Sequence, residues 1–200
     1  MDVRLVAWAR GVKARRTRGR GNLPVLWLFT DERRVADPRP SVARLPRGLA
    51  GVVLRHDGDP RRAELGRALA RICRARRLAL VVAGDVRLAS ALGAGVHLRG
   101  GRWPGHVRTR RGLLTSSAHG QAELRRARQA GAHLAFLSPA FPTPSHPETD
   151  GLGPARWSRL ARGACLPVAA LGGVDHMTVR RLPVGLCCGV GAIGALASVS

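Results

Sequence analysis

Lysine and acidic side chains are scarce in this chain of 200 residues. Lys13 is the only lysine, and Asp and Glu number 12 against 34 Lys and Arg, so the formal net charge is +22. Such a charge usually indicates a nucleic acid or an anionic membrane as partner. The arginines are instead scattered over predicted helix faces in a chain rich in Ala, Gly, Leu, Val and Pro, which is typical of codon bias. We therefore keep nucleic-acid binding, through the segment Arg10 to Arg20, as a minor hypothesis and expect residues 1–21 to be a flexible, solvated basic arm.

Cysteine motifs and long apolar runs are also missing. None of the four cysteines forms a CxxC pair or has a histidine at metal-ligand spacing, which argues against a zinc or dithiol site. Cys187 and Cys188 are neighbours in one apolar run and should point to opposite faces as inert, buried thiols. No apolar run approaches the roughly 20 residues of a membrane helix, and Leu5 to Ala9 is too short for a secretion signal. We expect a reduced, cytoplasmic protein without a membrane partner, and leave open whether it is a homo-oligomer.

Eight short apolar runs alternate with helical or loop segments along the chain. Continuous apolar runs are typical of parallel strands buried on both faces, and helical periodicity marks residues 60–76, 121–130 and 154–161. The pattern predicts an α/β fold, a single (β/α)8 barrel domain over residues 22–200. A doubly wound open sheet stays the alternative, because the link between the fourth and fifth runs and the C-terminus are both short. The runs are residues 25–29, 51–54, 78–82, 95–98, 113–116, 134–137, 168–171 and 185–188.

Glycines follow the last two predicted strands. Leu171-Gly172-Gly173 ends the seventh, and Gly189-Val190-Gly191-Ala192-Ile193 is expected to run from the eighth into a short helix. In such barrels this corner often holds a phosphate, which glycine backbone and a helix start can approach closely. The proline-rich loop after the sixth strand presents Thr143, Ser145 and His146, which suit an anionic ligand. Tight turns and a surface loop are the competing explanations. His97, inside an apolar run, is expected to be a hydrogen-bonded core or rim histidine.

Six segments carry a resemblance to a known family: Leu26-Trp27-Leu28-Phe29-Thr30-Asp31, Leu54-Arg55, Gly95-Val96-His97-Leu98, Ser117-Ala118-His119, Ser138-Pro139-Ala140-Phe141-Pro142-Thr143-Pro144-Ser145 and Leu171-Gly172-Gly173. In this order they resemble the thiamine phosphate synthase superfamily, and the resemblance spans Leu26 to Ile193. The resemblance implies a barrel that binds thiazole phosphate. It leaves two activities: a synthase joining thiazole phosphate to hydroxymethylpyrimidine pyrophosphate, and a tautomerase that aromatises the thiazole phosphate carboxylate.

Several departures from the synthase pattern concern the pyrophosphate and metal half of the site. The pattern Gln-Leu-Arg-Glu-Lys after the second strand becomes Val53-Leu54-Arg55-His56-Asp57, and Asn-Asp-Arg after the third becomes Ala83-Gly84-Asp85. The Gly-Gln and acidic residues after the fourth become Arg99-Gly100-Gly101-Arg102, and His146 replaces a lysine. Arg55, with Arg99 or Arg102, is left to neutralise charge, whereas the carboxylates suited to Mg2+ are lost. No metal ligand is assigned, and Mg2+ is expected only if the chain is a synthase.

These departures make the tautomerase branch the favoured hypothesis, with no cofactor. The resemblance implies that His119 shuttles protons, because an imidazole can donate and accept near neutral pH. Without the resemblance, His119 would be a helix-start residue. Arg55 would face the ring of a phosphorylated thiazole or the carboxylate on that ring. A synthase and a non-catalytic phosphate-binding or regulatory homologue are the alternatives. The remaining ligand-binding candidates are Ser117, Thr143, Ser145, His146, Gly172, Gly173, Gly191 and Ala192.

Overall fold

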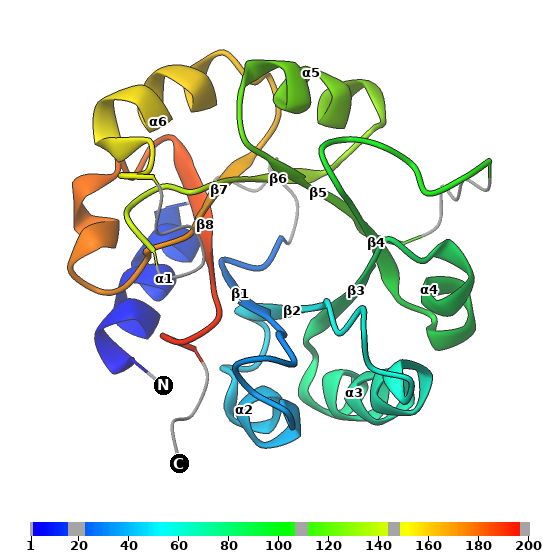
Figure 1. Ribbon diagram of the computed structural model, residues 1–200. Helices are drawn as coiled ribbons and strands as arrows, with labels where there is room; N and C mark the ends of the chain where they lie inside the picture. Colours follow the sequence, from blue (N-terminus) through cyan, green and yellow to red (C-terminus); the bar gives the residue numbers. More distant parts are fainter. Residues whose placement is uncertain (1, 16–22, 107–111, 144–148, 197–200) are drawn as a thin grey trace.

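The strands close into the predicted barrel. The computed structural model describes residues 2–15, 23–106, 112–143 and 149–196. Its eight strands pair in parallel in chain order, and β1 also pairs with β8 in parallel, Leu26 opposite Val190 and Leu28 opposite Ala192. This closure (Figure 1) confirms the (β/α)8 fold and excludes the open sheet. The strands are β1 (Leu26–Phe29), β2 (Ala50–Leu54), β3 (Ala79–Ala83), β4 (Gly95–Leu98), β5 (Leu114–Ala118), β6 (Leu134–Leu137), β7 (Val168–Leu171) and β8 (Cys187–Ala192).

The helices form the outer layer around the strands (Figure 1). The three segments with helical periodicity are helices whose ends lie within two residues of the prediction. Between β4 and β5 the described residues contain a turn closed by a bridge between Arg99 and Arg102 and no helix. After β7 there is a short 3-10 helix, η1 (Thr178–Arg181). The α-helices are α1 (Val3–Arg15), α2 (Arg39–Arg44), α3 (Arg62–Arg76), α4 (Val86–Leu92), α5 (Gln121–Gln129) and α6 (Gly153–Arg162).

The last strand differs from the prediction. β8 begins at Cys187, two residues after the expected start, and continues to Ala192. Gly189 and Gly191 therefore lie inside the strand, where the Val190 N–H donates to the Val25 carbonyl at 2.8 Å. A turn follows at residues 193–196 instead of the expected short helix. The prediction of a helix dipole at Ala192 was wrong, because these glycines serve strand packing and do not end the strand.

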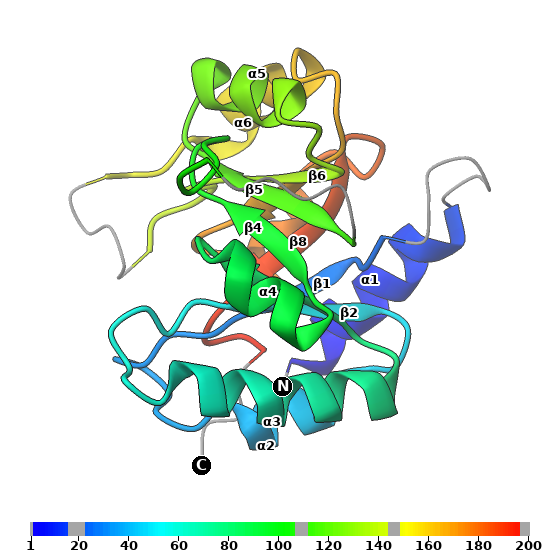
Figure 2. The same ribbon diagram turned by 90° about the vertical axis from the view of Figure 1, so that its right-hand side faces the viewer.

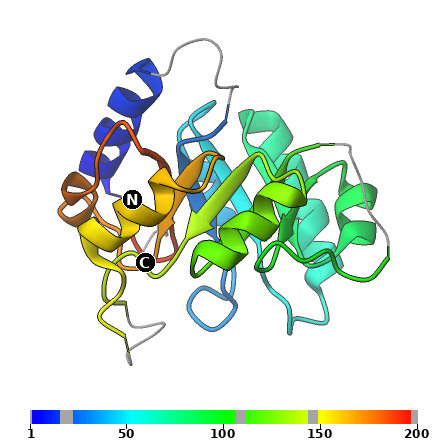
Figure 3. The same ribbon diagram turned by 90° about the horizontal axis from the view of Figure 1, so that it is seen from above.

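The N-terminal segment was also predicted wrongly as a flexible arm. Residues 3–15 form α1, which buries Leu5, Val6, Ala9 and Val12 at helical spacing and contacts β8. The helix starts at the carboxyl end of the barrel, where the Asp2 N–H donates to the Ala195 carbonyl. It runs toward the amino end (Figures 2 and 3), as a helix following β8 would. Its apolar stripe covers β8, which explains why residues 3–15 are ordered; residues 16–21 of the expected arm lie outside the described part.

Aromatic rings fill the barrel interior and form the floor beneath the strand ends. Phe136 stands edge-to-face against Trp27 at 5.5 Å and against Phe29 at 4.9 Å between ring centroids. Glycines on β2 and β8, the two strands that pair with β1, make room for these rings. A Cβ at Gly51 would lie 2.6 Å from the Trp27 ring, and one at Gly191 would lie 2.7 Å from Phe29. The strand glycines are thus required by the size of the interior side chains.

Cys187 and Cys188 point to opposite sides of β8, as predicted. Both are buried, with Cys187 in the layer between strands and helices and Cys188 in the barrel interior. In the part of the chain that the structure describes, no helix combines the length and apolar character needed to cross a bilayer.

Candidate functional site

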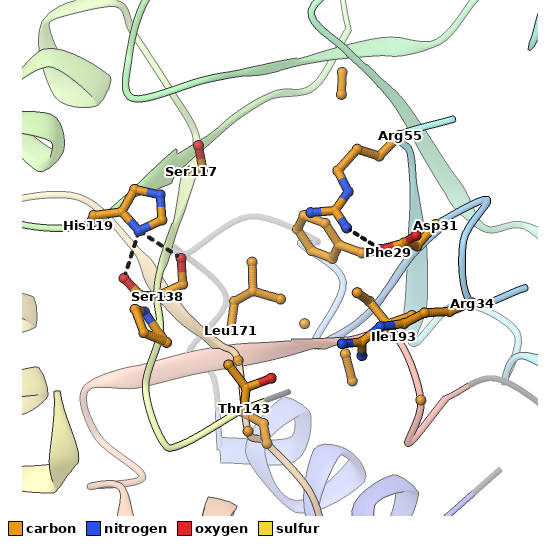
Figure 4. A pocket seen from close by; sticks show the side chains of 18 of the residues that line it. Phe29, Asp31, Arg34, Arg55, Ser117, His119, Ser138, Thr143, Leu171 and Ile193 are labelled. Carbon is orange, nitrogen blue, oxygen red and sulfur yellow. Dashed lines mark hydrogen bonds and ion pairs between the residues drawn. The ribbon is translucent and has the colours of Figure 1, made fainter. Parts of the chain in front are cut away.

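A cavity of about 1270 Å³ opens at the carboxyl ends of the strands and is lined by residues that follow or end all eight of them. This is the end at which (β/α)8 barrels bind their ligands. The cavity brings most of the predicted site residues together (Figure 4). Ser145 and His146 lie outside the described residues. The predicted residues that line the cavity are Arg55, Ser117, His119, Thr143, Gly172, Gly173, Gly191 and Ala192.

The Gly-Gly turn and the Phe-Pro-Thr loop form one hydrogen-bonded unit. The Ala140 N–H donates to the Leu171 carbonyl at 2.8 Å, and the Phe141 N–H donates to the Gly172 carbonyl at 3.1 Å. Gly172 and Gly173 have φ values of 87° and 63°, in the region that favours glycine. A Cβ at Gly173 would also collide with the backbone of the loop. Both positions therefore need glycine, and together they present backbone to the cavity beside Thr143.

The segment after β7 is stiffened by a carboxylate. Asp175 accepts hydrogen bonds from the backbone N–H groups of Met177 and Thr178, both at 2.8 Å, and the Thr178 hydroxyl lies 3.1 Å from it. Burial opposes ionisation of Asp175, but these hydrogen bonds outweigh it and hold the pKa of its carboxyl below the usual value. The same hydroxyl donates to the Gly173 carbonyl at 2.9 Å. The Gly-Gly turn is thus braced from behind as well as by the loop in front.

His119 enters the cavity from the end of β5 with a defined tautomer. Its ring Nδ1 lies 3.0 Å from the Ser138 carbonyl, which can only accept, so Nδ1 carries a proton. In the neutral ring Nε2 is then an acceptor. The His119 backbone N–H donates to Glu123 at 2.8 Å, which fixes the start of the loop. Nearby, the Ser117 hydroxyl accepts from the Gly100 N–H at 3.2 Å, so Ser117 also supports the loop after β4.

Arg55 lies on the opposite side of the cavity from His119 (Figure 4). Its guanidinium pairs with Asp31 at 2.8 Å, and its backbone N–H donates to the Thr30 hydroxyl at 2.9 Å. The buried His56 ring holds the same hydroxyl through Nδ1, also at 2.9 Å. Residues after β1 and β2 therefore position the Arg55 side chain at the cavity wall.

His97 is a buried structural histidine beneath this wall, as the sequence predicted. Its Nδ1 is 2.8 Å from the Thr115 hydroxyl, and its ring packs edge-to-face on Phe29. Burial, together with the positive charges of Arg55 and Arg99, lowers the pKa of His97 to about 3. The ring is therefore neutral at physiological pH and contributes no charge to the cavity floor.

The strand ends around β3 and β4 do not fit a divalent metal. Asp57 is paired with two arginines, Arg62 at 3.1 Å and Arg99 in a short contact. Asp85 accepts the Leu88 N–H as the N-cap of α4. Within the described residues no three His, Cys, Asp or Glu side chains cluster closely enough to hold a metal ion. The carboxylates that remain here are thus engaged by cations or by the helix start.

Sequence reasoning missed several charged residues that line the cavity. Asp31 and Arg34 follow β1, and Arg181 belongs to η1, with its guanidinium 5.4 Å from the Phe141 ring centroid. The position of Asp31 and Arg34 directly after the first predicted strand was a usable signal, because barrel sites collect residues from strand ends. Arg181 had no such signal, since it lies ten residues beyond β7 in the sequence.

Comparison with known proteins gives concordant matches. The family model described as "Thiamine monophosphate synthase" matches residues 27–196. A thiamine-phosphate synthase from Halorhodospira halophila is 35% identical over 179 residues, which cover 81% of this chain and 84% of the relative. One from Geobacillus thermodenitrificans is 35% identical over 148 residues, 71% of this chain and 66% of the relative. The solved structure of a thiamine phosphate pyrophosphorylase from Pyrococcus furiosus superposes with a TM-score of 0.72 at 24% identity, covering 88% of each chain.

Proposed function

This chain belongs to the thiamine monophosphate synthase family, and we propose that it is a thiamine-phosphate synthase, which joins thiazole phosphate to hydroxymethylpyrimidine pyrophosphate and releases pyrophosphate. The tautomerase hypothesis favoured by the sequence becomes the second candidate, because the relatives at 35% identity carry the synthase name.

The observation that carries the proposal is that one cavity has two separate ends whose residues suit anions. One end consists of the Gly172-Gly173 turn with Thr143, and the other consists of arginines around Arg55. A coupling reaction between a monophosphate and a diphosphate needs two such ends at once. The tautomerase substrate would bring only a single carboxylate to the second end, whereas several arginines there suit the larger charge of a diphosphate. The cavity, at about 1270 Å³, also exceeds the upper range of ordinary single-ligand pockets.

In the proposed reaction, the glycine end holds the phosphate of the thiazole through backbone N–H groups and the Thr143 hydroxyl. Arg55 binds the diphosphate of the pyrimidine substrate. Negative charge grows on the diphosphate oxygen as its bond to carbon breaks, and a guanidinium already positioned by Asp31 stabilises that charge without further reorganisation. The neutral His97 keeps the floor from adding charge below the reacting atoms.

The direct test is coupling of the two substrates by the purified protein, followed as formation of thiamine phosphate by chromatography. Omission of either substrate is the control for background. We expect product, and we expect an Arg55→Gln variant to lose roughly 100-fold in rate because a preorganised charge is removed. Complete absence of product with intact, folded protein, in the presence and absence of Mg2+, would contradict the proposal.

The tautomerase remains a second candidate because of one observation at His119. Its Nδ1–H is anchored on the Ser138 carbonyl, so Nε2 is the acceptor that a proton relay needs. Incubation with the non-aromatic thiazole phosphate carboxylate, followed by absorbance, tests this activity. Turnover that a His119→Asn variant abolishes, combined with no coupling activity in the wild type, would favour the tautomerase over the synthase.

A further inference from the structure

The described residues after β2, β3 and β4 lack the carboxylates of a metal site, and arginines stand near their positions. We propose that this end of the cavity binds a diphosphate without a divalent metal, because the guanidinium of Arg99, together with that of Arg55, supplies the positive charge directly. The inference deepens the proposed synthase function and rests on it for the identity of the anion. The binding step itself can be measured without any turnover.

The position of Arg99 is the first argument. Gly84, directly after β3, stands where the synthase pattern has the aspartate of Asn-Asp-Arg. A Cβ built at Gly84 would lie 3.4 Å from Nη2 and 3.5 Å from Cζ of Arg99. The guanidinium therefore lies next to the space into which a carboxylate side chain would project. The positively charged guanidinium of Arg99 thus lies where the synthase pattern has a metal-binding carboxylate. A divalent metal ion at this position would be repelled by Arg99.

The pairing of Asp57 is the second argument. Asp57 contacts both Arg62 and Arg99, but these two arginines differ in exposure. The Arg62 side chain is 17% exposed and is fixed beneath the loop, whereas the Arg99 side chain is 60% exposed and lines the cavity. Arg99 can therefore turn to an incoming anion while Asp57 keeps Arg62 as its counterion. Asp57 therefore keeps a counterion when the anion binds.

The electrostatic field at this end is the third argument. Arg55 and Arg99 both contribute to the lowered pKa of His97, after burial, so their charges act together on the cavity floor. Guanidinium groups also suit the ligand chemically, since their planar fork can donate two parallel hydrogen bonds to neighbouring phosphate oxygens. Arg55 follows β2, Arg99 follows β4, and both line the same cavity. Their guanidinium groups can thus bind a diphosphate through hydrogen bonds in place of metal–oxygen bonds.

Calorimetric titration of the protein with inorganic pyrophosphate, in EDTA and separately in Mg2+, tests the inference. We expect binding in EDTA that added Mg2+ does not tighten. Arg99→Gln should weaken this binding by roughly 10- to 100-fold, the effect of losing hydrogen bonds to a charged group, and Arg99→Lys should retain part of the affinity. The matched control is Arg87→Gln, since Arg87 is exposed on α4 away from the cavity. Thermal unfolding verifies that each variant is folded.

The outcomes separate this inference from the proposed function. No pyrophosphate binding in EDTA, binding that appears only with Mg2+, or an Arg99→Gln variant that binds like the wild type would each overturn it. Coupling activity with Mg2+-dependent pyrophosphate binding would leave the synthase proposal standing and the inference refuted. Metal-free binding that depends on Arg99, without any coupling activity, would support the inference and reject the synthase.

Discussion

The two ends of the cavity differ in which part of the chain forms them, backbone at one end and side chains at the other. The glycine end, after β6 and β7, is made of backbone held by hydrogen bonds between the Phe-Pro-Thr loop and the Gly172-Gly173 turn. The arginine end, after β2 to β4, is made of long arginine side chains that form ion pairs with aspartates. Backbone geometry restricts which residues can stand at a position, whereas a charged side chain can be exchanged if a neighbour compensates. The glycine end therefore keeps the family motif, and the arginine end has departed from it.

The largest expected effect comes from forcing a side chain into the glycine end. Gly173→Ala places a Cβ against the backbone of the Phe-Pro-Thr loop at a φ of 63°, which is strained for alanine. We expect thiazole phosphate binding to weaken by roughly 100-fold, since small displacements of a positioned ligand have effects of this size. Pyrophosphate binding at the other end should change little. Isothermal titration with each ligand measures both.

Gly185→Ala is the matched control for that variant. Gly185 has no atom near its Cβ position and no positive φ, so the substitution should leave both ligands unaffected. If Gly173→Ala also weakened pyrophosphate binding, the two ends would be coupled through the barrel and the contrast between them would fail.

The glycine end could be predicted from the sequence more fully than the arginine end. Glycines at strand ends and the order of apolar runs predict the barrel and the glycine end, because both depend on backbone constraints that act locally. The long side chains of Arg34 and Arg181 were missed, since a loop sequence does not specify where a flexible arginine points. The same limit applies to Arg99, whose contact with the Gly84 position depends on how β3 and β4 align.

Two further errors in reading the sequence have physical causes. Gly189 and Gly191 were read as a turn, because the groups that require glycine at these positions lie more than 150 residues away in the sequence. A Cβ at Gly189 would collide with the backbone of Val25, and one at Gly191 with the ring of Phe29. The helix α1 was read as a flexible arm, because the basic segment from Arg10 to Arg20, which overlaps its second half, hid an apolar stripe of four residues. In both cases a partner distant in the sequence decides the local structure.

A smaller effect is expected when a carboxylate is restored at the arginine end. Gly84→Asp would place its side chain beside Arg99 and neutralise part of that charge. We expect metal-free pyrophosphate binding to weaken roughly tenfold, because a charged hydrogen-bond partner is diverted from the ligand. Gly84→Asn is the control of equal size, and it carries the same backbone strain at a φ of 65° without the charge. Equal losses in both variants would assign the effect to strain and remove the electrostatic explanation.

The smallest effect tests whether α1 supports the glycine end. Asp2, at the start of α1, accepts hydrogen bonds from the Arg4 and Leu5 backbone N–H groups and lies 2.7 Å from the His176 ring in the segment after β7. Burial disfavours the charged form, but these hydrogen bonds outweigh it, so the pKa of Asp2 is lowered in the folded protein. A lowered pKa means that the carboxylate stabilises the fold above its unfolded value, about 3.9, and that this stability is lost as the pH falls through the folded value.

Asp2→Asn should therefore reduce the free energy of unfolding by about 1 kcal/mol at pH 7, because asparagine can still cap the helix but lacks the negative charge that a helix N-terminus favours. The difference from the wild type should shrink in urea unfolding as the pH is lowered toward 3, because Asp2 takes up protons and loses the charge that asparagine already lacks. Asp150→Asn, at an exposed loop position, is the control. A deficit that stays the same at both values of pH would show that the charge of Asp2 is not its source. A parallel loss of thiazole phosphate affinity would mean that the stiffness of the glycine end depends on α1 as well as on its own backbone.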